Sequence, residues 1–190
     1  LLHSFAGSSD GADPVGGLIQ DSSGNFYGVA YTGGASNNGT LFKLSPLGAF
    51  TLLHSFAGRP SEGTGPAGTL VFDGKGDLYG TTYTGGAAKG WGTVFEYAGD
   101  SLTTLKTFDP GGALPRAGVH LQASKLFGTT SGGFGSWYGM YGGTIFEVGV
   151  ATPLYTFTGG PDGAQPMGGV IGDNAGNLYG TTAAGGSGTF

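Results

Sequence analysis

The side chains best suited to ligand binding are aromatic residues in two corresponding loops. Trp91 ends one loop, and the other, residues 134–142, contains Trp137, Tyr138 and Tyr141. Exposed Trp and Tyr rings present a flat apolar face with one polar tip, which suits sugar rings and the centres of protein interfaces. We predict that these four residues form a ligand-binding patch. The alternative is that these aromatic side chains fold back and fill the face of a small closed ring of repeats.

Acidic residues are the candidates for catalysis, because glycoside hydrolysis uses two carboxylates about 5 to 9 Å apart. Three of the acids recur at one position of an internal repeat, which indicates turn chemistry rather than a dedicated acid/base pair. No Ser-His-Asp set stands out, and no phosphate-binding glycine loop precedes a helix. We therefore predict no catalytic residue, with a propeller-type glycoside hydrolase as an alternative. The candidate acids are Asp10, Asp13, Glu62, Asp109 and Asp162, of which Asp10, Glu62 and Asp162 are the recurring three.

The potential metal ligands are scattered or better explained by turns. His3 and His54 occupy the same repeat position and His120 lies apart, so these histidines do not form a credible zinc set. Aspartates in Asp-x-x-Gly segments lack the ligand density of a calcium loop, and we expect them to cap turns. The chain contains no cysteine, which excludes disulfides, thiolate metal sites and a cysteine nucleophile. We expect no metal and no cofactor.

Composition narrows the class of protein. The chain has 12 acidic and 7 basic residues and no basic run, which argues against binding to nucleic acid. No apolar stretch is long enough to span a membrane. Glycine accounts for 44 of 190 residues, yet aromatic residues make up 13% of the chain, which indicates an ordered fold with many tight turns. Because the sequence lacks an initial Met and ends within a motif, we expect a fragment of a longer chain.

Four copies of one repeat must position these residues. A Tyr/Phe-Gly step recurs about every fifty residues, and each copy continues with a Gly-Gly pair and a Gly-Thr-apolar-Phe segment. A proline precedes each copy at a matching place. The glycines are Gly28, Gly80, Gly128 and Gly180, and the prolines are Pro14, Pro66, Pro115 and Pro166.

Each repeat contains four short strand-like runs, which in the first copy cover 17–20, 26–31, 40–44 and 50–56. Four antiparallel strands with this period are typical of a β-propeller. We predict one all-β domain over 1–190, a propeller of four four-stranded blades whose last blade is closed by the N-terminal strand. Part of a larger propeller and an open β-solenoid remain as alternatives. The repeat units cover approximately 16–56, 67–108, 116–157, and 168–190 plus 1–5.

The repeated pattern Asp-x-x-Gly-Asn/Asp-Leu-Tyr-Gly-Thr-Thr, followed by Gly-Gly and Gly-Thr-Val-Phe, resembles the GloVer-type tandem repeat of bacterial proteins. The resemblance covers essentially the whole chain. The first repeat departs from the pattern at Val29-Ala30, and the third lacks the Asp-x-x-Gly-Asn turn. The resemblance implies propeller-like repeats in an exported, often surface-anchored protein, and it implies no assigned chemistry.

We therefore expect a non-catalytic extracytoplasmic or cell-surface repeat module that binds a glycan or protein. Its ligand would lie on the loop face, the side that carries the connections between repeats and the loops between the second and third runs of each repeat. These connections differ most between copies, and function on a repetitive scaffold usually lies where the copies differ. A purely structural repeat segment of a larger surface protein is the main alternative.

Overall fold

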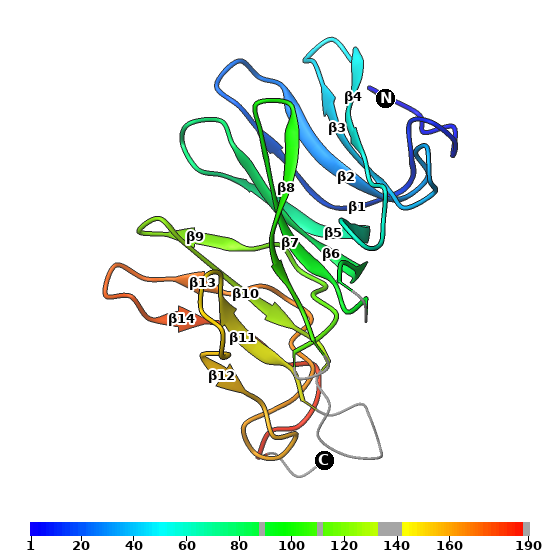
Figure 1. Cartoon of the computed structure of the whole chain (residues 1–190). Coiled ribbons are helices and arrows are strands. Elements are labelled where there is room, and N and C mark those ends of the chain that lie inside the picture. Colours follow the sequence, from blue (N-terminus) through cyan, green and yellow to red (C-terminus); the bar gives the residue numbers. More distant parts are fainter. Residues whose placement is uncertain (88–89, 110–111, 133–141, 188–190) are drawn as a thin grey trace.

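The protein is all-β, and the computed structural model describes residues 1–87, 90–109, 112–132 and 142–187 (Figure 1). The described residues contain no helix, and their antiparallel sheets have four, four, four and two strands. The first sheet is β1 (Ala12–Gln20), β2 (Phe26–Thr32), β3 (Thr40–Leu44) and β4 (Phe50–Ser55). The second is β5 (Gly63–Phe72), β6 (Leu78–Gly85), β7 (Thr93–Ala98) and β8 (Ser101–Thr107). The third is β9 (His120–Gln122), β10 (Lys125–Thr130), β11 (Thr144–Glu147) and β12 (Tyr155–Thr156), and the fourth is β13 (Ile171–Gly172) with β14 (Leu178–Tyr179).

The aspartates between the first two strands of a sheet cap hairpin turns, as the sequence predicts. Asp21 Oδ1 accepts hydrogen bonds from the backbone N–H groups of Ser23 and Asn25, both at 2.9 Å. Its other oxygen accepts from the Tyr27 hydroxyl at 3.0 Å. Asp173 forms the same set of contacts in the fourth sheet. These carboxylates therefore fix the turn and the strand that follows it.

The Tyr-Gly glycine is explained by an aromatic ring on the neighbouring strand. Gly80 of β6 lies opposite Phe95 of β7, and a Cβ on Gly80 would lie 2.5 Å from the tip of the Phe95 ring. The other sheets repeat this pairing with Gly28 opposite Phe42 and Gly128 opposite Phe146. An aromatic ring that covers a glycine across a strand pair fixes register and fills the gap left by the missing side chain.

A second phenylalanine, from the preceding repeat, packs on the aromatic ring that covers the glycine. Phe56 follows β4, and its ring centroid lies 5.2 Å from that of Phe95 in the next sheet. Phe108 packs on Phe146 at 4.9 Å in the same way. Phe56 is fully buried, and burying one such side chain contributes about 1.5 to 3 kcal/mol. The first and second repeats therefore each place one phenylalanine, the plug, against the ring of the next repeat, its socket.

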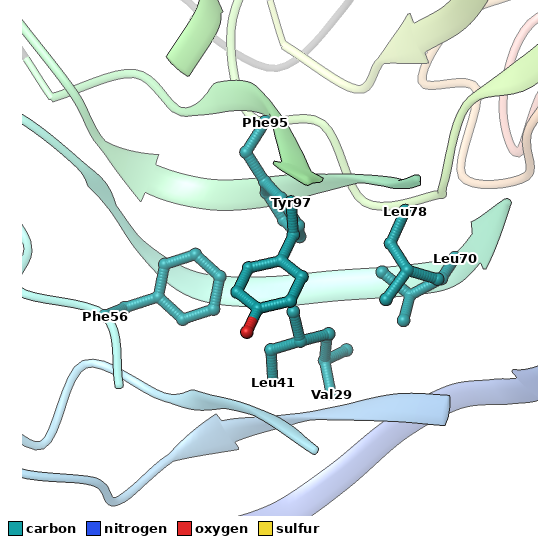
Figure 2. Close-up of a cluster of buried hydrophobic side chains, with 7 residues drawn as sticks. All are labelled: Val29, Leu41, Phe56, Leu70, Leu78, Phe95 and Tyr97. Atoms are coloured by element: carbon teal, nitrogen blue, oxygen red, sulfur yellow. The ribbon is translucent and has the colours of Figure 1, made fainter. Parts of the chain in front are cut away.

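The core lies between consecutive sheets (Figure 2). Val29 and Leu41 of the first sheet face the apolar side chains of the second sheet. The Tyr97 hydroxyl completes this layer by donating to the carbonyl of Leu53 at 3.2 Å. A second cluster joins the second and third sheets. The first cluster comprises Val29, Leu41, Phe56, Leu70, Leu78, Phe95 and Tyr97, and the second comprises Val94, Phe108, Val119, Leu126 and Phe146.

Neighbouring sheets meet along their first strands, where β1 contacts β5, β5 contacts β9 and β9 contacts β13. We call this side of the stack the hub edge. Gly68 has a φ of +76°, and a Cβ there would overlap the backbone of Ala117 and Gly118. Only glycine allows so close an approach with that backbone conformation. The hydroxyl of Thr81 also links two repeats, because its one hydrogen is shared between the carbonyl of Ala117 at 2.8 Å and that of Ala67 in its own sheet at 2.9 Å.

The described residues do not show the predicted closure of the ring. Leu1–Phe5 forms no strand, and Phe5 packs on Phe42 of the first sheet with ring centroids 5.0 Å apart. This is the plug position that Phe56 and Phe108 occupy in later repeats. The sheet β13–β14, which Leu1–Phe5 would complete, lies at the opposite end of the stack (Figure 1). The N-terminal run therefore packs against the first sheet, and the described residues show no closed ring.

No helix capable of crossing a membrane is found among the described residues.

Candidate functional site

The loop face predicted from the sequence is formed by segments that bind one another through their backbones. The loop after β2 is held to the preceding connection by Gly34 N–H donating to Ser8 O at 2.7 Å. The loop after β6 is held in the same way by Gly86 N–H donating to Glu62 O at 2.8 Å. These contacts hold each loop after a second strand against the segment that leads into the first strand of the same sheet.

A cavity of about 300 Å³ lies on the hub edge, between residues of the first three repeats. Tyr31 and Tyr83 come from the ends of β2 and β6, and Arg116 comes from the segment before β9. Side chains alternate along a strand, so Tyr83 lies on the same face of β6 as Thr81, which points towards the hub. We call this cavity the hub groove; its lining is Val15, Gly16, Tyr31, Ala67, Gly68, Tyr83 and Arg116.

Arg116 is exposed but held in one orientation. Its Nη2 donates to the Tyr83 hydroxyl at 2.8 Å, and its Nε donates to Ser131 Oγ at 3.2 Å. Ser131 is itself fixed, because its hydroxyl donates to the carbonyl of Leu114 at 2.9 Å. The guanidinium carbon lies 4.6 Å from the centroid of the Tyr83 ring, a cation–π distance. The groove therefore presents a pre-oriented positive charge on an aromatic surface.

The two tyrosines form the aromatic part of the groove. Their ring centroids are 6.4 Å apart with the planes inclined by 47°, and both residues are half-buried. Burial raises the pKa of Tyr31, as does the neighbouring Tyr83, while the Arg116 charge acts in the opposite direction. Tyr31 is therefore a neutral hydroxyl at physiological pH that can donate or accept a hydrogen bond.

No carboxylate of the described chain lies within ion-pair distance of Arg116. The ion pairs formed by described residues join His3 to Asp10, His54 to Glu62 and Lys125 to Glu147. The protein has a net charge of −5, so the Arg116 guanidinium in the lining of this cavity is a local positive charge on an acidic molecule. It makes the hub groove suited to an anionic group.

The aromatic patch predicted from the sequence is only partly described. Trp91 is half-buried and packs against the second core cluster, and its carbonyl accepts a hydrogen bond from Leu114 N–H at 2.9 Å. Leu114 is two residues from Arg116 in the sequence, so Trp91 is linked through its backbone to the segment that carries Arg116. The other members of the predicted patch, Trp137, Tyr138 and Tyr141, lie outside the described residues. The four-residue patch therefore stays a prediction.

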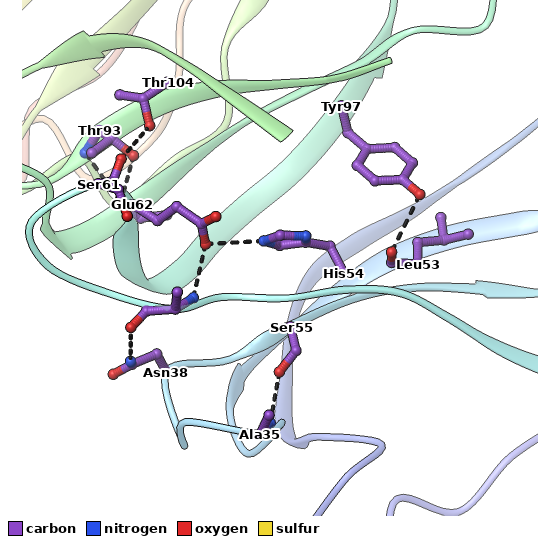
Figure 3. A network of polar contacts seen from close by, with 12 residues as sticks. Ala35, Asn38, Leu53, His54, Ser55, Ser61, Glu62, Thr93, Tyr97 and Thr104 are labelled. Atoms are coloured by element: carbon purple, nitrogen blue, oxygen red, sulfur yellow. Dashed lines mark hydrogen bonds and ion pairs between the residues drawn. The ribbon is translucent and has the colours of Figure 1, made fainter. Parts of the chain in front are cut away.

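Each of the three recurring acids contacts residues at the end of the repeat that precedes it, and Figure 3 shows this for Glu62. Glu62 Oε2 lies 3.0 Å from the His54 ring and accepts from Ala57 N–H at 2.8 Å. Asp10 pairs with His3 at 3.1 Å, and Asp162 accepts from the Tyr155 hydroxyl at 2.9 Å. Each acid joins the end of one repeat to the start of the next. The described contacts therefore engage these three carboxylates in three separate junctions.

The remaining candidates from the sequence also have local roles or no shared site. Asp13 accepts a hydrogen bond from the Thr32 hydroxyl at 3.1 Å, and the carbonyl of Asp109 accepts from Gly112 N–H at 3.2 Å. His120 lies in β9, in a different sheet from the His54 junction. Within the described ranges, no three His, Asp or Glu side chains gather as a metal site would require.

The sequence analysis missed Tyr31, Tyr83 and Arg116. A signal was present, because the repeats differ at these positions. The tyrosine position is occupied by Ser131 and Ala183 in the third and fourth repeats, and the arginine position holds valine, alanine or methionine elsewhere. The sequence alone does not show that the ends of β2 and β6 and the segment before β9 come together at the hub edge.

The fold and the groove define a class of protein, an all-β tandem-repeat scaffold whose repeats are stacked antiparallel sheets. The chain belongs to the Gloeobacter/Verrucomicrobia repeat family, whose sequence model matches residues 1–190. This match confirms the resemblance carried by the Tyr-Gly-Thr-Thr and Gly-Thr-Val-Phe segments. No curated protein matches the chain.

Proposed function

We propose that this chain is a non-catalytic binding module of an exported or cell-surface bacterial protein and that it holds a glycan or protein ligand on its loop face. The observation that carries the proposal is the hub groove. Two half-buried tyrosines and an oriented arginine line one cavity where the repeats otherwise carry small or apolar residues. Concave sites with aromatic walls and a few fixed polar groups are the usual form of ligand pockets.

The proposal includes a finer architecture, an arc of a larger β-propeller. Successive sheets contact one another along their first strands, which is the radial arrangement of propeller blades. The steps from the first to the second sheet and from the second to the third use the same plug-and-socket contact, so further repeats can extend the arc without a new interface. This favours the larger-propeller alternative over a closed ring of four blades.

A binding role is favoured over a hydrolytic one by the way the acids are used. A glycosidase needs two carboxylates that face one substrate bond. Here Asp10, Glu62 and Asp162 each accept a backbone N–H and a side-chain contact within their own junction. Replacing any of these acids would remove hydrogen bonds that join two repeats, so we expect the main effect to be a loss of stability.

The test is a capture experiment on glycan and protein arrays with the wild-type chain and a Tyr31→Ala/Tyr83→Ala variant. We expect the wild type to capture a defined ligand class and the variant to lose at least tenfold in apparent affinity, because both ring faces of the groove are removed. Tyr179→Ala is the matched control, since Tyr179 is 53% exposed and lies in β14, away from the groove. Thermal melts check that all three proteins are folded.

The alternatives give different results in the same experiment. A purely structural repeat segment captures nothing on either array. A hydrolase turns over a glycosidase substrate panel, and Glu62→Gln or Asp162→Asn abolishes the turnover. A Trp137→Ala variant tests the aromatic patch, because lost capture with an unchanged melt would assign the ligand contact to that loop.

A further inference from the structure

We propose that the hub groove recognises acidic sugars, with Arg116 binding the carboxylate of a uronic acid unit and the two tyrosines contacting the sugar ring. This inference rests on the proposed binding function and names the ligand class of the same site. It follows from three features of the groove: the remaining N–H donors of Arg116, the paired tyrosine rings and a second cavity that adjoins the groove at Arg116.

Arg116 retains the donors needed for a carboxylate. The Tyr83 and Ser131 contacts use one N–H of Nη2 and the N–H of Nε. Within the described residues, Nη1 has no protein partner, and the second N–H of Nη2 is also unassigned. A guanidinium forms its strongest pairs with carboxylates through two parallel N–H donors. Because two contacts and the Tyr83 ring already hold Arg116, little side-chain freedom remains to be lost on binding.

The two tyrosines favour a sugar over a simple carboxylate. The inclined rings of Tyr31 and Tyr83, 6.4 Å apart, line the same cavity as the guanidinium. A pyranose has an apolar face of C–H groups that packs on an aromatic ring and a polar rim that hydrogen-bonds to phenol hydroxyls. A bare anion would use Arg116 and leave both rings exposed.

A second cavity adjoins the hub groove along the hub edge, which favours an oligosaccharide over a single sugar. A second cavity of about 420 Å³ shares Gly68 and Arg116 with the hub groove and extends to Gly169 and Val170. Arg116 therefore lies between two adjoining hollows rather than at the closed end of one. This suits a carboxylate carried within a chain of sugar units, as in a polyuronate, with further units on either side.

The experiment measures calorimetric binding of trisaccharides of galacturonate, glucuronate and mannuronate, each as the free acid and as its methyl ester. We expect at least one free acid to bind, and its methyl ester to bind at least tenfold more weakly. Arg116→Gln should lower the affinity for the free acid to the level of the ester and leave binding of the ester unchanged. Unchanged ester binding also shows that the variant is folded.

Two further variants sharpen the result. Arg116→Lys keeps the charge but loses the two-pronged geometry, so its affinity for the acid should fall between those of the wild type and Arg116→Gln. Lys75→Gln removes a cation in the turn between β5 and β6 and should bind as the wild type does. A monosaccharide should bind more weakly than the trisaccharide.

Several outcomes would overturn the inference. It is wrong if ester and acid bind equally, or if Arg116→Gln retains the wild-type affinity for the acid. If no uronate binds but the arrays yield a neutral glycan or a protein ligand that depends on Tyr31 and Tyr83, the inference fails and the proposed function stands. If neither uronates nor the arrays give a ligand, both fail together.

Discussion

At the scale of single residues, the two threonines of the Tyr-Gly-Thr-Thr segment have separate tasks. The hydroxyl of Thr81 reaches across to the next repeat, and Thr129 does the same by donating to Gly168 O at 2.8 Å. The second threonine of each pair stays within its sheet, where Thr82 shares a buried hydroxyl contact of 2.8 Å with Thr93. The first repeat has Val29 at the linking position and cannot form this bond.

Replacing Thr81 with valine should destabilise the protein by about 1 to 2 kcal/mol, because the buried carbonyl of Ala117 loses its donor. Urea unfolding measures the change in the free energy of unfolding. Thr81→Ser keeps the hydroxyl and is the control. Equal stability of the valine and serine variants would show that the hydrogen bond between repeats contributes nothing.

Acid should weaken the fold through the turn aspartates. The side-chain contact of Asn25, with further hydrogen bonds, lowers the pKa of Asp21 from 3.8 to about 2. Asn177 is the main cause of the same shift in Asp173, whose pKa is also about 2. A carboxylate with a lowered pKa in the folded state stabilises the fold above its ordinary pKa and loses that effect as the pH falls towards the folded value. The melting temperature should therefore fall between about pH 4 and pH 2.

An Asp21→Asn/Asp173→Asn variant tests the source of this pH dependence. It should melt lower than the wild type at neutral pH and show a flatter decline below pH 4. Asp77→Asn is a mild control, because the corresponding turns already carry Asn25 and Asn177 at that place. A decline as steep as that of the wild type would assign the acid sensitivity to other groups.

At the scale of elements, the recurring contact between sheets is a phenylalanine ring that covers a glycine on one side and meets a phenylalanine of the preceding repeat on the other. Gly80 leaves room for the ring of Phe95, and that ring supports Phe56 from the previous repeat. The register of β6 and β7 therefore places the Phe95 ring over Gly80 within one sheet. Phe56, which follows β4 of the preceding sheet, then packs against that ring. Sheet pairing and sheet stacking depend on the same ring.

Gly80→Ala should lower the free energy of unfolding by about 1 to 3 kcal/mol, because the new methyl group displaces the Phe95 ring. Gly168→Ala is the matched control, since a Cβ there meets its nearest atom at 3.8 Å. A double-mutant cycle with Phe95→Leu isolates the mechanism. The two substitutions should be less than additive together, and strict additivity would contradict the proposed clash.

The elements themselves were largely predictable, and the reasons are local. Strand runs, turn aspartates and the repeat period all follow from patterns within about fifty residues. The shortened turn of the third repeat was also visible in the sequence, and the structure has a two-residue hairpin there with φ of 49° at Ala123 and 63° at Ser124. Positive φ at both central residues is what such a tight hairpin requires.

The hub groove was not predictable in the same way. Tyr31, Tyr83 and Arg116 belong to three repeats, and none forms a motif with the others in sequence. Their meeting depends on the close packing of first strands at glycines such as Gly68, which is a property of the stack. The sequence instead favoured the loops with tryptophans, and Trp91 proves to pack against the core.

At the scale of the whole molecule, the stack is unequal along its length. The first and second sheets share a large buried cluster, whereas β13 and β14 form a two-stranded sheet at the other end. Ile171 in β13 is 67% exposed. In a repeat protein, each unit is stabilised mainly by its contacts with neighbouring units. A sheet that packs against two neighbours should therefore be more stable than a sheet that packs against one.

Hydrogen exchange followed by mass spectrometry should show this gradient. Backbone amides of β2, β3, β6 and β7 should exchange most slowly, because these strands lie inside four-stranded sheets with the largest core. Amides of β13 and β14 should exchange fastest. Uniform protection along the chain would indicate that the sheets unfold as a single cooperative unit.

The plug and the socket ring that it contacts lie about three quarters of a repeat apart in the sequence, in different repeats. A tandem duplication of one period therefore carries a complete matching pair, wherever in the period its breakpoints fall. Recombination within the gene can lengthen or shorten the array without creating an unmatched joint, provided that the number of residues gained or lost is a whole period. The number of repeats in such a protein can therefore change rapidly in evolution. The hub groove is different, because it is lined by residues of three repeats that differ in sequence, and the addition of one repeat does not create a second groove.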